Sequence, residues 1–229
     1  MTNWDNIVSG KELNSAKTRR KNDFEFKKEW KVALHEMEDE GWEYVNDYAD
    51  PRFVKVRKEK SFSERFENRV WMLMCQMGFT HMNRDRNFHM AHDKDGHTQQ
   101  IDVFAADEET VLIIECKAAE KRKDGNFKKE IEALQGQKDG LIKEARKRFP
   151  NCKVKFIWAT DNYIMQKADL KRLEDWGIVY FGESTIAYYC DLVKHLGSCA
   201  RYQLLGNLFA NTEIKNMQNR IPAIEGKMG

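Results

Sequence analysis

Residues 101–117, IDVFAADEETVLIIECK, carry three chemically active side chains on two apolar runs. The acidic triplet Asp107-Glu108-Glu109 separates the runs and predicts the turn of a β-hairpin. Alternate residues of a strand share a face, so Glu115 and Lys117 point the same way at the end of the second run. Asp102 lies on the antiparallel neighbour and comes close to them if the hairpin is tight.

This grouping of charges favours a metal site. Two converging carboxylates repel each other, and burial raises the free-energy cost of ionising them. A divalent cation removes that conflict, and Mg²⁺ prefers one or two carboxylates together with waters and phosphate oxygens. A lysine beside such a site can offset charge that develops on a phosphate. The simpler alternative is a surface hairpin with an ordinary ion pair, which stabilises a protein by roughly 0–1 kcal/mol.

The elements around the hairpin predict an α/β fold, with a mixed central β-sheet flanked by helices. Residues 61–78 have a helical stripe of apolar side chains, with Ser61 or Ser63 as the N-cap and Glu67 beside the stripe. Residues 79–90 are irregular and contain a short strand. The later elements are a helix over 127–149, a strand over 154–159, a helix over 168–176, a strand over 177–181, and closing helices over 184–196 and 200–210.

The first 60 residues predict an N-terminal extension of helix and strand. Residues 1–20 are polar and without periodicity, which is typical of a mobile arm. Residues 23–44 have apolar side chains at helical spacing, and residues 53–57 alternate like a strand. The domains expected are therefore 1–60 as the extension, 61–197 as the main domain, and 198–229 as a C-terminal helix and linker.

Asp102, followed across the hairpin by Glu115-Cys116-Lys117, resembles the PD-(D/E)xK nuclease superfamily. The resemblance implies a restriction-endonuclease-like fold. It implies that Asp102, Glu115 and the main-chain carbonyl of Cys116 bind Mg²⁺ or Mn²⁺. Lys117 would position the attacking water and stabilise the phosphate. The proline that precedes the first acid in the family pattern is Ile101 here, which makes the motif less specific.

Two further residues fit this resemblance. Glu67 lies on the helix before the sheet, where Mrr-like members carry an acid, and it would assist the metal or the water. Gln135 lies on the helix after Lys117, where many members place a glutamine, and Gln137 is a rival for that role. The implied activity is metal-dependent hydrolysis of DNA. The alternatives are an inactive nucleic-acid-binding or structural module of the same fold, and an RNA nuclease.

Residues 221–229 resemble the start of DGQHR-type domains, which occur in proteins associated with DNA phosphorothioation and defence. This resemblance implies a nuclease module joined to a further C-terminal domain. The basic run at 120–124 could contact phosphates, or could be a solvated loop. The sequence leaves open whether a homodimer forms.

Composition is compatible with a DNA partner but does not require one. The chain has 39 basic and 37 acidic residues, so what matters is where the charges lie. Its five cysteines form no CxxC pair. No apolar run approaches the ~18 residues of a membrane span, so no membrane partner is expected. The odd cysteine count and the absence of a signal peptide favour the cytoplasm.

Overall fold

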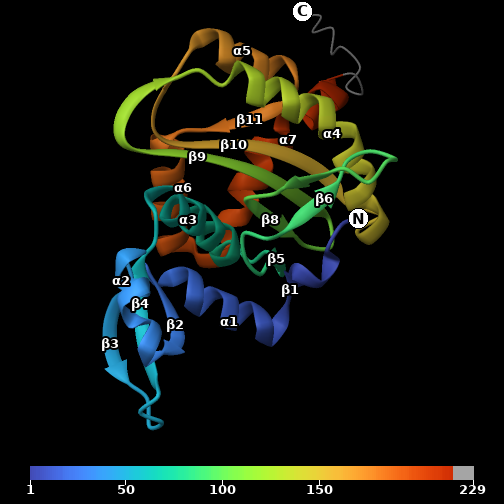
Figure 1. Cartoon of the computed structure of the whole chain (residues 1–229). Helices are drawn as coiled ribbons and strands as arrows, with labels where there is room; N and C mark the ends of the chain where they lie inside the picture. The colour runs from blue at the N-terminus through green and yellow to red at the C-terminus, as the bar shows by residue number, and fades with distance from the viewer. Residues whose placement is uncertain (219–229) are drawn as a thin grey trace, which may run out of the picture.

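The computed structural model describes the backbone of residues 1–218 and the side chains of residues 1–209. Its centre is a six-stranded mixed sheet of order β1-β5-β8-β9-β10-β11 (Figure 1). β8 and β9 form the predicted antiparallel hairpin, and β9, β10 and β11 run parallel. The strands are β1 (Ile7–Val8), β5 (His81–Asn83), β8 (Val103–Ala106), β9 (Thr110–Gly125), β10 (Lys153–Met165) and β11 (Ile178–Phe181).

Helices cover both faces of this sheet, which confirms the predicted fold class. One core contains α1 (Gly10–Lys21), α3 (Phe62–Gln76), α6 (Glu183–Leu196) and α7 (Ala200–Gln218). The other contains α4 (Lys128–Arg148) and α5 (Lys167–Asp175). The alternation of β9 separates the two cores, since Leu112 and Ile114 belong to the first and Val111 and Ile113 to the second.

Several local signals in the sequence are confirmed. Ser61 caps α3, because its side chain accepts a hydrogen bond from the backbone N–H of Glu64 at 3.2 Å. The Asp107 carboxylate shapes the hairpin turn by accepting from the N–H groups of Glu109 at 2.9 Å and Thr110 at 2.8 Å. A second hairpin, β6 (His89–Ala91) and β7 (Thr98–Gln100), follows β5.

The prediction of a mobile N-terminal arm is wrong. Residues 1–20 contain the 3-10 helix η1 (Trp4–Asn6), strand β1 and most of α1. β1 pairs with β5 at the edge of the central sheet, and Trp4 packs against Phe88 and Phe104. The buried residues of α1 are only Ala16 and Arg20, so this helix packs against the domain with few apolar side chains.

The helix predicted over residues 23–44 is also wrong, except at residues 34–39. That segment is β2 (Phe24–Trp30), η2 (Lys31–Ala33) and the short helix α2 (Leu34–Asp39), followed by β3 (Glu43–Asp47). With β4 (Phe53–Glu59), which confirms the strand predicted at 53–57, they form a three-stranded sheet of order β2-β4-β3. This small sheet projects from one end of the molecule (Figure 1).

The end of the chain is described only in part. α7 follows the short helix η3 (Gly197–Cys199) and confirms a helix after residue 200. The DGQHR-like residues 221–229 lie outside the described residues. Within the described part of the chain, no helix is long and apolar enough to cross a membrane.

Candidate functional site

The register of the β8–β9 hairpin brings Asp102 to the strand end that carries Glu115. The last printed pair of the ladder is Val103 with Ile114, so continuing this register places Asp102 opposite Glu115. Asp102 lies just outside β8, and its Oδ2 accepts a hydrogen bond from the backbone N–H of Cys116 at 2.8 Å. This contact fixes one carboxylate beside the other at the point where the two strands part.

Glu115 and Lys117 form an ion pair on the same face of β9, as the alternation predicts. Lys117 Nζ lies 2.6 Å from Glu115 Oε1. The Lys117 side chain is 30% exposed and the Glu115 side chain is 16% exposed. The ammonium also lies 5.7 Å from the ring centroid of Trp158 on β10. The pair is therefore partly shielded from water but still reachable from solvent.

Burial makes both carboxylates of the site costly to ionise. Burial raises the pKa of Glu115 to about 7, with a further contribution from the charge of Asp102, against the opposing effect of Lys117. Burial likewise raises the pKa of Asp102, although the N–H of Cys116 and the charge of Lys117 oppose it. The pKa of Lys117 is raised in spite of burial, because Glu115 stabilises the ammonium.

Glu67 lies on α3 in the same electrostatic neighbourhood. Its side chain is 4% exposed, and its pKa is raised to about 7 by burial and then by the charge of Asp102. Arg86, from the segment between β5 and β6, approaches both of its oxygens, at 2.7 Å from Oε2 and 2.9 Å from Oε1. The structure thus brings a third carboxylate to the site and pairs it with an arginine.

Sequence reasoning missed Arg86 and a buried asparagine, Asn83, on β5. Asn83 is fully buried; its Nδ2 donates to the main-chain oxygen of Asp102 at 3.1 Å, and its Oδ1 accepts from the N–H of Phe104 at 3.0 Å. Asn83 therefore holds the main chain on both sides of Val103. No sequence motif marks either residue, because each reaches the site through tertiary contacts alone.

The glutamines on α4 are not joined to the carboxylates by any hydrogen bond in the described residues. Gln135 has a buried Oε1 atom without a hydrogen-bond partner among these residues. α4 covers the sheet face toward which Glu115 and Lys117 point, as the mixed core of α4 and β9 residues shows. The choice between Gln135 and Gln137 therefore stays a prediction.

The Cys116 side chain belongs to the opposite face. It is 7% exposed within the core beneath α3, and burial raises the pKa of its thiol well above the ordinary value. A protonated thiol is a poor metal ligand. Only the main-chain oxygen of Cys116 therefore remains as its contribution to a metal site.

The basic run at 120–124 is not a loop. It is exposed and continues β9, which pairs with β10 again from Lys123↔Tyr163 to Gly125↔Met165. Lys121, Arg122 and Lys123 thus project from an extended ribbon at the end of the strand that carries Glu115 and Lys117.

No family model and no curated protein matches the sequence. One similar solved structure is protein VC1899 from Vibrio cholerae, with 12% identity and a TM-score of 0.38 over 83% of this chain and 52% of that chain. Another is Can2 from Sulfobacillus thermosulfidooxidans in complex with cyclic tetra-adenylate, with 14% identity and a TM-score of 0.35 over 82% of this chain and 58% of that chain. At these values neither protein informs the chemistry of the site.

Proposed function

We propose that this chain is a metal-dependent endonuclease that hydrolyses phosphodiester bonds in DNA, as a member of the PD-(D/E)xK superfamily. The observation that carries the proposal is the convergence of Asp102, Glu115 and Lys117 at the open end of the β8–β9 hairpin. Glu67, held by Arg86, adds a fourth group of the kind that this chemistry uses.

The residues present fit Mg²⁺ or Mn²⁺. In the described structure, hydrogen bonds occupy Oδ2 of Asp102 and Oε1 of Glu115, which leaves Oδ1 and Oε2 as hard oxygen ligands. Asp102, Glu115 and the main-chain oxygen of Cys116 would hold the cation. The raised pKa values of both carboxyls support this fit, because burial makes their ionised forms costly and an added positive charge would offset that cost.

When bound, the cation supplies Lewis acidity at a phosphate oxygen and makes a coordinated water more acidic. The chain's own groups provide the rest. The Lys117 ammonium stays charged at neutral pH, since its pKa is raised, and can stabilise negative charge on the phosphate. Glu67, with a pKa of about 7, can accept a proton from water near neutral pH, and Arg86 fixes its position.

DNA is the substrate favoured by the sequence resemblance, and the exposed ribbon Lys121-Arg122-Lys123 supports a polyanionic ligand. A role in DNA modification or defence rests on the DGQHR-like residues 221–229. Gln135 would contact the site from α4.

Plasmid nicking tests the proposal. The full chain is incubated with supercoiled DNA in Mg²⁺, in Mn²⁺ and in EDTA, alongside Asp102→Ala and Lys117→Ala. Lys171→Ala is the matched control, because this exposed lysine on α5 pairs with Asp175 across one helical turn, away from the carboxylates. Cleavage that needs metal and disappears in the two site variants but not in the control supports the nuclease. Retained DNA binding without cleavage would support the inactive module, and cleavage of RNA alone would support the RNA nuclease.

A further inference from the structure

The small β2-β4-β3 sheet has one packed face and one open face. Val54 and Val56 point inward, fully buried against Met37 of α2. Strand alternation therefore turns the residues on either side of Val54 and Val56, and those paired with them on β2, toward the opposite face. This outer face consists of Phe24, Phe26, Lys28 and Trp30 on β2, facing Glu59, Arg57, Lys55 and Phe53 on β4.

Large aromatic rings are exposed on this outer face. Phe26 is 42% exposed and Trp30 is 48% exposed, and Tyr48, in the turn between β3 and β4, is 38% exposed. The rings of Trp30 and Phe53 lie 4.2 Å apart, so they form a continuous aromatic surface. An exposed group of aromatic side chains on this scale is typical of a binding surface.

Cations lie over these rings. Lys28 Nζ is 4.0 Å from the centroid of Phe53, Lys55 Nζ is 4.4 Å from that of Phe26, and the Arg57 guanidinium is 4.6 Å from that of Phe24. Glu43 neutralises Arg57 at 2.9 Å. By contrast, Lys28 and Lys55 form no ion pair with a carboxylate among the described residues, so both remain able to bind an anion.

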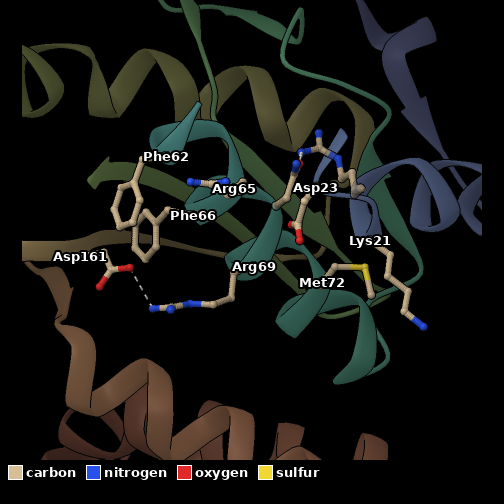
Figure 2. Close-up of a pocket in the computed structure, with 10 residues that line it drawn as sticks. Lys21, Asp23, Phe62, Arg65, Phe66, Arg69, Met72 and Asp161 are labelled. Carbon is tan, nitrogen blue, oxygen red and sulfur yellow. Dashed lines mark hydrogen bonds and ion pairs between the residues drawn. The ribbon is translucent and has the colours of Figure 1, made fainter. Parts of the chain in front are cut away.

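The outer face continues into two basic pockets. Phe24 and Lys21 line a pocket of 660 Å³, and Lys21 also lines a pocket of 350 Å³ against α3. Figure 2 shows this second pocket, with the rings of Phe62 and Phe66 side by side and Arg69 extended to Asp161. The aromatic surface thus leads toward the helix that carries Glu67.

Arg20 lies between that pocket and Glu67 of the candidate site. It lines the pocket, is 7% exposed, and donates to Asn68 Oδ1 at 2.9 Å. Asn68 is the neighbour of Glu67 in α3, and Arg20 and Glu67 lie within electrostatic range of each other. The basic pockets therefore lead from the outer face to α3, next to the residue that carries the Glu67 carboxylate.

We propose that the outer face of the β2-β4-β3 sheet binds single-stranded DNA, with bases stacked on its rings and phosphates paired with Lys28 and Lys55. Alternating rings and cations match a polymer that alternates bases and phosphates, and base–aromatic stacking is tolerant of sequence. A duplex hides its base faces and could not use the rings. The choice of DNA rests on the proposed function, whereas the stacking surface does not.

Binding without cleavage tests the inference separately from the nuclease activity. The full chain in EDTA is titrated into a fluorescent oligothymidylate, longer than a site of ~4–16 nucleotides. Trp30→Ala and Phe26→Ala should each weaken binding about 5-fold to 100-fold, as expected for loss of one stacked base. Trp30→Phe should restore most of the affinity. Tyr188→Ala on α6 is the control, because Tyr188 is 49% exposed, like Trp30, but lies elsewhere.

Thermal unfolding of each variant checks that the fold is retained, and the exposed positions of both rings make large losses of stability unexpected. The double variant Lys28→Ala/Lys55→Ala should lower the slope of log Kd against log salt by about 0.7 for each phosphate that the two lysines neutralise. The inference is overturned if the wild-type chain does not bind the oligonucleotide, or if Tyr188→Ala weakens binding as much as Trp30→Ala. Preference for duplex DNA or for RNA of the same sequence would also overturn it.

Discussion

Replacing the buried Asn83 with alanine should destabilise the chain and loosen the site together. Asn83 makes three hydrogen bonds through its side chain. Nδ2 donates to the main-chain oxygens of Asp85 at 3.0 Å and Asp102 at 3.1 Å, and Oδ1 accepts from the N–H of Phe104 at 3.0 Å. Each bond stabilises the fold by about 1 kcal/mol net, and each buried group left without a partner costs about 1–3 kcal/mol. The expected loss for Asn83→Ala is therefore about 3 kcal/mol or more.

Urea denaturation of the metal-free protein measures this loss, and a thermal melt should show a decrease in Tm of roughly 6–12 °C for a chain of this size. Mn²⁺ affinity should fall as well, because the main chain of Asp102 is no longer held. Asn46→Ala is the matched control, since the Asn46 side chain donates to the exposed main-chain oxygen of Asp47, far from the central sheet. It should change stability by less than about 0.5 kcal/mol. A loss below about 1 kcal/mol for Asn83→Ala would refute the role given to its hydrogen bonds.

Three further predictions concern packing, a buried charge and pH. Gly136→Ala should stabilise α4 by about 1 kcal/mol, because an added Cβ there contacts no other atom. Gly140→Ala should destabilise the fold, because an added Cβ there would overlap the main-chain oxygen of His92, which follows β6. Thermal melts of the two variants measure this difference. Arg86→Ala should lower the free energy of unfolding by about 2–3 kcal/mol at pH 8, where Glu67 is ionised, and by less at pH 5.5, where Glu67 binds a proton. Equal losses at the two pH values, measured by urea denaturation, would contradict this prediction. Mn²⁺ affinity should fall as pH decreases through about 7, up to about tenfold per unit, because a proton competes for Glu115. Calorimetric titrations that show no pH dependence in this range would contradict competition between a proton and Mn²⁺ at Glu115.

The sequence predicts the main domain well because its signals are local. The turn at Asp107, the cap at Ser61 and the alternation of β9 each depend on neighbouring residues, and the structure contains all three. The N-terminal region lacks such signals. Phe26 and Trp30 are four residues apart, which fits one face of a helix and equally one face of a strand. Only pairing with β4 decides between them, and that pairing is a tertiary contact.

The residues of the candidate site likewise fall into those with local sequence signals and those positioned by tertiary contacts. Asp102, Glu115 and Lys117 could be found because a hairpin links them through its register, and Glu67 through its place on α3. Arg86 lies in an irregular segment, so no periodicity indicates where its side chain points. Asn83 resembles any polar residue of a short strand until the contacts around it are known.

The most direct test of the central claim is a crystal structure of the chain soaked with Mn²⁺, with anomalous difference maps to locate the ion. We expect a peak coordinated by Asp102 Oδ1, Glu115 Oε2 and the main-chain oxygen of Cys116, with Lys117 facing the same cavity. No such peak should appear in crystals of Asp102→Ala. If these carboxylates bind no Mn²⁺ at a concentration that supports cleavage, or if the peak lies only elsewhere, Asp102 and Glu115 are not the metal ligands.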